Sequence, residues 1–277
     1  MNYRPVLNNI PPVVKNLIII NVLFWLGTWV VKNMGIDLVD ILGMHYPGSE
    51  KFMLHQIFTH MFMHSPLGGR SGGITHILFN MFALYMFGRV LESVWGSKRF
   101  LIYFIVTGLG AIALHTFVNF LEINSIQNVI QAFQNTPSPE ILDQFVNKNL
   151  PNATSQVQDF INVWYDDPTN PAYASEGLHL MQRILELKMN IPTVGASGAV
   201  FGVLLAFGML FPNTQLMLLF PPIPIKAKYF VMGYGAIELY LGFTQSGGSV
   251  AHFAHLGGML FGFILIKYWK KNSNKFY

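Results

Sequence analysis

Long apolar runs alternate with polar stretches along this chain of 277 residues. A bilayer core about 30 Å thick needs roughly 20 apolar residues in a helix that crosses it. The runs that approach this length are residues 17–31, 76–94, 100–120, 194–211, 229–243 and 250–269. The fifth run is the weakest, because Gly233, Gly235 and Glu238 interrupt it. The pattern predicts an all-α polytopic membrane protein with six transmembrane helices in a single domain, residues 1–277.

Two longer polar connections separate these runs, residues 32–75 between helices 1 and 2 and residues 121–193 between helices 3 and 4. The second connection carries more acidic than basic side chains. Its segments PEILDQFVNKNL and LHLMQRILELKM have apolar residues at helical spacing. We therefore expect residues 121–193 to form a polar insert of short amphipathic helices, packed on the membrane surface or on each other.

Composition agrees with a membrane protein, because 52% of the residues are hydrophobic and 11% are charged, whereas soluble domains carry about 25% charged residues. The absence of cysteine excludes disulfides, thiolate metal sites, iron–sulfur clusters and a cysteine nucleophile. The N-terminal segment lacks the pattern of a removable signal peptide, so we expect the first run to stay as an anchor. The net charge of +4 does not lead us to predict a nucleic-acid partner.

Basic residues indicate the orientation, since lysine and arginine accumulate in cytoplasmic loops. They form four groups: Arg4 and Lys15; Arg89, Lys98 and Arg99; Lys226 and Lys228; and Lys267, Lys270, Lys271 and Lys275. All four groups fall on one side if both termini are cytoplasmic. The two long polar connections are then external.

Unusual polar residues share one depth in that topology. Helices 2, 4 and 6 start at the outer face, and near their starts lie His76 and Asn80, Ser197, and His252 and His255. Polar groups inside membrane helices are costly and by default mark function or an interhelical contact. Their common level predicts that they belong to one site.

Small residues suggest how helices 4 and 6 meet. Two pairs of glycines lie four residues apart, Gly198 with Gly202 and Gly258 with Gly262. Such faces allow helix backbones to approach closely. Packing of these faces would bring Ser197 and His255 within hydrogen-bonding reach.

A serine beside a histidine base is the usual pair for nucleophilic acyl transfer. The developing oxyanion needs donors, and His76, Asn80 and the backbone N–H of Ser197 are available. Helices 4 and 6 contain no carboxylate that could orient His255. We therefore expect packing to hold that ring, with Phe201, one turn after Ser197, as the aromatic neighbour.

Four segments carry a resemblance to a known family: GASGAVFG around Ser197, HILFNMF from His76 through Asn80, AHFAHLGGMLFG around His255, and FTHMFMH over residues 58–64. Together they resemble the rhomboid family of intramembrane serine proteases, of the bacterial type with a six-helix core. The resemblance covers nearly the whole chain except residues 121–193.

The resemblance implies a role for each matching residue. Ser197 would be the nucleophile and His255 the general base and acid, while His76, Asn80 and the Ser197 N–H would form the oxyanion hole. His255 is chosen over His252 because it fits the His-x-x-Gly-x-x-x-Gly spacing. The supporting residues would be Gly195 in the active-site turn, Gly198 and Gly258 in the helix contact, and Phe201 against the His255 ring.

The resemblance further implies cleavage of transmembrane segments near the outer face, without a cofactor or metal. The partners would be transmembrane substrates and the lipid bilayer, and the location the bacterial inner membrane. Two departures concern the first external loop. His55 and Gln56 stand where the family often has a Trp-Arg pair, and PLGGRSGG is inserted before His76.

Two other functions remain open at the level of sequence. One is a catalytically silent rhomboid-like protein that binds transmembrane helices. The other is a metal or haem protein built on the nine histidines. His60 and His64 are spaced i, i+4 and could share a metal, although we find no companion carboxylate or cysteine for them. The roles of His60, His64 and His252 are not assigned.

Overall fold

The fold is taken from a computed structural model of the chain, which describes residues 10–65, 73–217, 222–244 and 249–272. Arg4, Lys275 and most of the PLGGRSGG stretch, on which sequence predictions rest, lie outside these residues.

Five of the six apolar runs lie wholly in helix, and the fourth, residues 194–211, is helical over Ser197–Leu210. The helices are α1 (Pro12–Lys32); α4 (Gly73–Ala83), a π-helical stretch η3 (Leu84–Gly88) and α5 (Arg89–Trp95) in continuous succession; α6 (Ser97–Asn135); α10 (Ser197–Leu210); α11 (Ala227–Thr244); and α12 (Ser249–Asn272). Among the described residues, three helical segments are long and apolar enough to cross a membrane, namely Pro12–Lys32, Gly73–Trp95 and Ser97–Asn135. Helix α10 is apolar but shorter.

Helix α6 is longer than its apolar run predicts, because it continues past Phe120 to Asn135. The segment 121–135 contains neither proline nor glycine to stop a helix. Its buried residues Ile123, Ile126, Ile130 and Phe133 recur at helical spacing. The loss of hydropathy after residue 120 therefore marks a change in the surroundings of the helix rather than its end.

Shorter elements connect these helices. They are α2 (Leu38–Leu42), α3 (Gln56–Thr59), a 3-10 turn η2 (His60–Phe62), α7 (Pro139–Asn149), α8 (Ser155–Asp166), α9 (Pro171–Met189), and the antiparallel strands β1 (Gln215–Met217) and β2 (Pro224–Lys226). Local sequence sets several starts. Ser138 caps α7 by accepting a hydrogen bond from the N–H of Ile141, and Asn170 caps α9 in the same way through Ala172. A proline follows each cap, which suits the first helical position.

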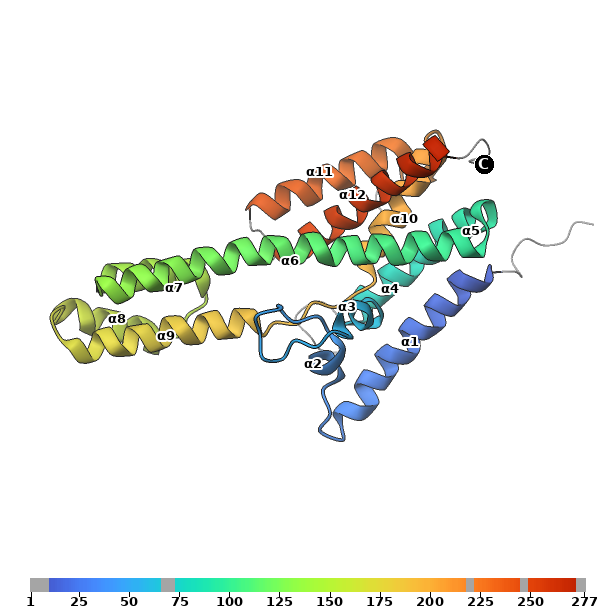
Figure 1. The fold of residues 1–277 in the computed structure, drawn as a ribbon. Coiled ribbons are helices and arrows are strands. Elements are labelled where there is room, and N and C mark those ends of the chain that lie inside the picture. Colours follow the sequence, from blue (N-terminus) through green and yellow to red (C-terminus); the bar gives the residue numbers. More distant parts are fainter. Residues whose placement is uncertain (1–9, 66–72, 218–221, 245–248, 273–277) are drawn as a thin grey trace, which may run out of the picture. The chain divides into compact units, whose positions relative to one another are not determined.

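The chain divides into two compact units (Figure 1). The first unit comprises Met1–Met44, Met53–Phe117 and Pro192–Tyr277, and the second comprises His45–Phe52 and Val118–Ile191. The three sequence segments of the first unit contain all the predicted site residues. Its last three helices form a packed group, in which α12 contacts both α10 and α11.

A buried carboxylate fixes the start of α1 in the first unit. Glu92, only 2% exposed, accepts hydrogen bonds from the N–H groups of Val13 and Val14, at 3.0 and 2.8 Å, and from Ser97 Oγ at 2.7 Å. The first N–H groups of a helix have no partner within the helix. A carboxylate satisfies them and also matches the positive end of the helix dipole.

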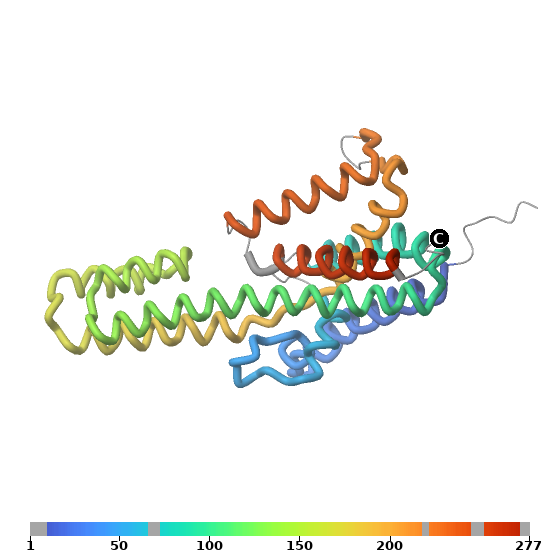
Figure 2. The backbone as a smooth tube through the Cα atoms, turned by 45° about the horizontal axis from the view of Figure 1, so that its top comes forward, coloured from blue at the N-terminus to red at the C-terminus, as the bar shows by residue number. Residues whose placement is uncertain are grey.

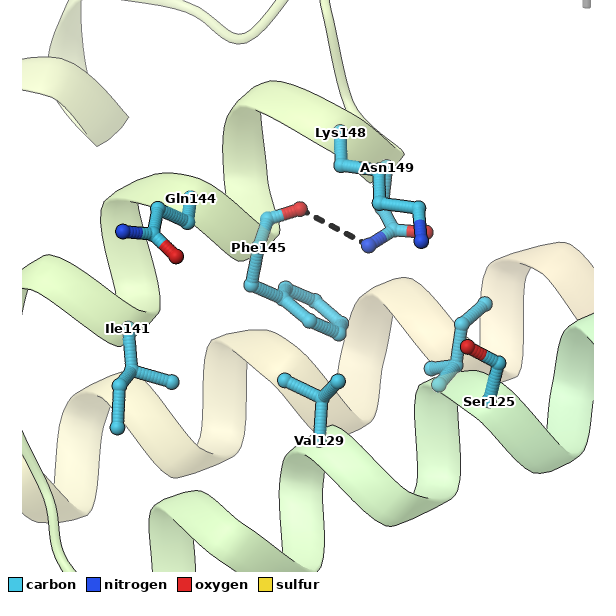
Figure 3. Close-up of a pocket in the computed structure, with 8 residues that line it drawn as sticks. Ser125, Val129, Ile141, Gln144, Phe145, Lys148 and Asn149 are labelled. Carbon is cyan, nitrogen blue, oxygen red and sulfur yellow. Dashed lines mark hydrogen bonds between the residues drawn. The ribbon is translucent and has the colours of Figure 1, made fainter.

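The second unit is built by α7, α8, α9 and the end of α6 (Figure 2), and these helices enclose a hydrophobic core of their own. Trp164, Phe133 and Leu142 are fully buried in it, and Lys188 pairs with Glu122 at 2.6 Å. The amphipathic helices expected here are present and pack on each other. A cavity of about 150 Å³ lies between α6 and α7, where the Phe145 ring faces Val129 (Figure 3). None of the predicted site residues lines it.

Candidate active site

The segment before Ser197 is held at three points. Thr193 forms a two-way backbone bridge with Met44, with N···O distances of 2.9 and 2.8 Å, and its hydroxyl lies 2.7 Å from His115 Nε2. The Gly195 N–H donates to the carbonyl of His60 at 2.9 Å. These contacts fix the chain immediately before α10, which begins at Ser197.

Gly195 occupies a backbone conformation that requires glycine, with φ at +129°. A Cβ atom placed there would lie 3.1 Å from His76 Cε1, 3.2 Å from His76 Nε2 and 3.5 Å from Ser197 Oγ. The His76 ring and the Ser197 hydroxyl therefore both border this glycine. A side chain at position 195 would crowd the space that they share.

His76 presents one ring nitrogen to that space. The Ser65 N–H donates to His76 Nδ1 over 3.5 Å, so in the neutral ring the proton resides on Nε2, the nitrogen beside Gly195. Asn80 is spaced one turn further along α4 and is buried, and its amide donates to the His76 carbonyl at 2.8 Å. The other N–H of that amide is available for a second acceptor.

A second histidine, His64, packs against the His76 ring. The rings of His64 and His76 meet edge to face with centroids 5.1 Å apart. His64 Nε2 donates to Asn21 Oδ1 at 2.8 Å, and the Asn21 amide donates to the Leu17 carbonyl at 2.7 Å. Burial lowers the pKa of His64, which lies outside the spanning helices, to about 3. His64 is therefore a neutral, structural side chain at ordinary pH.

His60 has a similar role in the same loop. Its Nδ1 donates to the carbonyl of Gln56 at 3.0 Å, and burial lowers its pKa to about 4. Its own carbonyl receives the Gly195 N–H. The FTHMFMH segment thus supports the turn before Ser197, and His60 and His64 do not form a metal-ligand group in the described residues.

Helices α10 and α12 approach each other closely where Gly198 faces Gly258. A Cβ on Gly258 would overlap the carbonyl of Gly198, and a Cβ on Gly198 would lie 3.3 Å from the carbonyl oxygen of Ala254. Ser197 directly precedes this contact and His255 lies one turn before it on α12. The two side chains therefore start from adjoining backbone.

Gly202 of α10 and Gly262 of α12 both lie against α6. A Cβ on Gly202 would meet Thr107 of α6 at 2.6 Å, and a Cβ on Gly262 would overlap the Tyr103 hydroxyl. Tyr103 donates to the Gly202 carbonyl at 2.8 Å. At this level the side chains nearest to both glycines come from α6, which packs against α10 and α12.

The His255 ring stacks on Phe201, with centroids 4.0 Å apart and an interplanar angle of 5°. Tyr234 of α11 covers Phe201, with ring centroids 5.3 Å apart. The aromatic neighbour expected one turn after Ser197 is thus in contact with the ring. It restrains the tilt of His255 but leaves its rotation within the ring plane free.

A carboxylate restrains that rotation. Glu238 of α11 is buried, and its Oε2 lies 2.9 Å from His255 Nδ1 and 2.7 Å from His252 Nδ1. The expectation that packing alone orients His255 is wrong, since it considered only helices 4 and 6. Glu238 was visible in the sequence as an acid within an apolar run, and such a residue is a functional candidate in its own right.

Ser197 Oγ and His255 are not joined by a hydrogen bond in the structure, although both residues are described. Hydrogen bonds of catalytic groups are often long without substrate and shorten in the reacting complex. Glu238, His252 and His255 form the group of described residues whose ligand atoms are close enough to hold a metal ion.

The departures in the first loop have structural partners. His55 Nε2 and Gln56 Nε2 lie 2.9 and 3.2 Å from the carbonyl oxygen of Ile41. Gln56 Oε1 accepts from the Met53 N–H at 3.1 Å. The pair that replaces Trp-Arg therefore ties α3 to the end of α2.

Comparison with known proteins supplies the family. The family model "Rhomboid domain" matches residues 51–123 and 173–271. The chain is 37% identical over 84 residues to "Rhomboid protein 1, mitochondrial" of Saccharomyces cerevisiae. That alignment covers 30% of this chain and 24% of the yeast protein, so the chain spans about a quarter of the relative that it matches. On the strength of the family match, which extends over more than half of its residues, the chain belongs to the rhomboid family.

Proposed function

We propose that the chain is an intramembrane serine protease that cleaves transmembrane segments, with Ser197 as nucleophile and His255 as general base. The observation that carries this proposal is the arrangement of His255. Its ring is stacked on Phe201, its Nδ1 is bonded to Glu238, and its helix meets α10 next to Ser197. A carboxylate accepts but cannot donate, so Nδ1 holds the proton and Nε2 is the free base.

The proposed reaction is acyl transfer in two stages. The Ser197 proton moves to His255 Nε2 as Oγ bonds to the scissile carbonyl carbon, and the carbonyl oxygen becomes an oxyanion. The C–N bond then breaks, and the leaving nitrogen takes the proton from Nε2. Water then acts as the nucleophile in place of the serine: it gives a proton to Nε2 as its oxygen bonds to the acyl carbon. The C–Oγ bond breaks and Oγ takes the proton from Nε2, which frees the acid product and restores Ser197.

Three donors border the position of the oxyanion in this proposal. They are Nε2–H of His76, the amide of Asn80 and the backbone N–H of Ser197, which starts α10 and has no partner within the helix. Removal of one such donor costs about 10²–10³ in rate in other serine hydrolases. His76 lies beside Gly195, and a Cβ atom placed on that glycine would also lie 3.5 Å from Ser197 Oγ.

For the membrane arrangement we propose six spans, formed by α1, α4 to α5, the first part of α6, α10, α11 and α12. Both termini would be cytoplasmic and the site near the outer face, in a bacterial inner membrane. Helix α6 supports an external insert over residues 121–193. Its 39 residues extend about 58 Å at 1.5 Å per residue, roughly twice the bilayer core.

The test is labelling of the purified protein by a serine-reactive fluorophosphonate, in detergent and in liposomes. Wild type should be labelled, and Ser197→Ala and His255→Ala should each lose about 10³-fold or more in labelling rate. The control is Ser93→Ala, which removes a hydroxyl bonded to its own helix at Arg89 and should retain labelling. Cleavage of a transmembrane substrate by wild type and not by Ser197→Ala would complete the assignment.

Two results would contradict the proposal. Labelling retained in Ser197→Ala would place the nucleophile elsewhere. No labelling of wild type in either medium, with no turnover of any transmembrane substrate, would favour a silent rhomboid-like protein that binds transmembrane helices.

A further inference from the structure

Glu238 bonds two imidazoles through a single oxygen atom. Oε2 is 2.7 Å from His252 Nδ1 and 2.9 Å from His255 Nδ1. The two histidine rings are nearly perpendicular, at 86°, so they reach the oxygen from different directions. All three side chains are largely withdrawn from solvent, with exposed fractions of 8% for Glu238, 15% for His252 and 18% for His255.

These distances fit two hydrogen bonds to one oxygen better than three ligands of one metal ion. Zinc holds nitrogen and oxygen ligands at about 2.0–2.2 Å in tetrahedral arrangement, which keeps ligand atoms roughly 3.3 Å apart. Here the oxygen lies at hydrogen-bond distance from both nitrogens. Each Nδ1–H therefore donates a hydrogen bond to the same carboxylate oxygen.

We infer that Glu238 is a positioning and charge-stabilising residue for the proposed general base His255, and that His252 modulates it by competing for the same oxygen. This inference rests on the proposed function. Glu238 fixes the Nδ1–H tautomer, aims Nε2 toward Ser197, and offsets the charge that His255 gains when it takes the serine proton. It acts as the acidic member of a catalytic triad does.

His252 gives the arrangement a pH response. When His252 is neutral, its donated hydrogen bond takes part of the negative charge of Oε2. When it is protonated, its charge opposes protonation of His255. The groups facing His255 are His76 from α4, Tyr234 and Glu238 from α11, and His252 from its own helix α12. Of these, only Glu238 carries negative charge at neutral pH.

The experiment measures fluorophosphonate labelling rate from pH 5 to 9 for full-length protein in detergent. Glu238→Gln keeps the size of the side chain and an acceptor for Nδ1–H but removes the charge. We expect its maximal rate to fall by about 10- to 100-fold and the acid limb of its profile to move about one pH unit lower. His252→Asn should keep the maximal rate within about twofold and move the acid limb higher, because a neighbouring positive charge is removed.

Matched variants separate charge from structure. Glu122→Gln makes the same chemical change at a salt bridge of the second unit and should leave the profile unchanged. Glu238→Asp retains the charge, so it should keep the acid limb near the wild-type pH even where the rate is reduced. A rate loss in Glu238→Gln with an unmoved acid limb would overturn the inference, since a merely structural residue gives that result.

A second readout does not depend on activity. Histidine-selective NMR of the same proteins should show His252 and His255 titrating as a coupled pair in wild type. The pair should titrate at lower pH in Glu238→Gln and as one site in His252→Asn. Coupled titration in a protein that is never labelled would contradict the proposed function, but not the pairing of His252 and His255 through Glu238. Uncoupled titration, or stoichiometric zinc in wild type lost in both variants, would overturn the inference.

Discussion

The two units of the chain differ in what they bury and what they expose. The first unit encloses polar side chains such as Glu92, Glu238 and Asn21, and exposes large apolar ones, among them Phe79 at 60% and Phe243 at 74%. The second unit differs from it in what its core contains. Its core is built of Trp164, Phe133, Leu142 and other apolar side chains, and the ion pair Arg183–Glu186 lies on its surface.

The difference indicates two solvents. Apolar surface exposed on this scale is unfavourable in water and marks a region that contacts lipid or another protein. In lipid, helices associate through close backbone packing and interhelical hydrogen bonds rather than through burial of apolar area. The first unit should therefore depend on its glycines and polar contacts, and the second on the volume of its core.

The largest expected effect is that of Gly258→Leu in the first unit. A side chain at position 258 collides with the Gly198 carbonyl, so α12 cannot approach α10 without rearrangement. We expect a loss of more than about 3 kcal/mol in the free energy of unfolding, measured by denaturant titration in detergent.

The control for this prediction is Gly233→Leu in α11, where a Cβ meets nothing within 4 Å. It should change stability by less than about 1 kcal/mol, the scale of the helix-propensity gain. Equal effects at positions 233 and 258 would mean that close helix approach does not stabilise the first unit.

The next effect tests the second unit. Trp164 is fully buried, and its ring meets Phe133 edge to face with centroids 5.7 Å apart. Trp164→Ala should destabilise this unit by about 3–5 kcal/mol, seen as faster hydrogen exchange in α7, α8 and α9.

Its neighbour Val163 is 48% exposed, so Val163→Ala should fall within about 0.5 kcal/mol of wild type. Fluorophosphonate labelling of Ser197 provides the second measurement. If the two units are stabilised by different interactions, labelling should persist in Trp164→Ala. A parallel loss of labelling and exchange protection would show that the units unfold together.

The same comparison explains which features could be predicted from sequence. Hydropathy located the apolar helices, because a long apolar run is recognisable without knowledge of its tertiary contacts. It misplaced the end of α6, since residues 121–135 enter the core of the second unit without leaving the helix. Periodicity predicted the helices of the insert because they bury one face, as soluble helices do.

The candidate site was predictable where chemistry follows from local spacing. The motifs around Ser197, His76 and His255 identified the candidate residues. They could not identify Glu238, because it acts through contacts with His252 and His255 of α12, which lie 14 and 17 positions away in the sequence. Nor could they show that Gly198 meets both Ala111 of α6 and Ala254 of α12, whereas the nearest neighbour of Gly202 is Thr107 of α6.

The smallest expected effect concerns pH and distinguishes the polar interior of the first unit from the apolar core of the second. Burial lowers the pKa of His64 to about 3, from 6.5 in the unfolded chain. Because the folded value is the lower one, protonation favours unfolding. The stability is fully present above pH 6.5 and is lost as pH falls toward 3.

When the pH falls from 7 to 5, protonation of His64 in the unfolded chain should lower the free energy of unfolding by about 2 kcal/mol. His64→Asn keeps a donor for Asn21 but does not titrate. Its unfolding free energy should therefore fall by about 2 kcal/mol less than that of wild type over the same interval. The measurement is denaturant unfolding at the two pH values. A slope unchanged by His64→Asn would contradict a buried neutral His64, whereas Trp164→Ala should lower stability equally at both pH values, since its core contains no titrating partner.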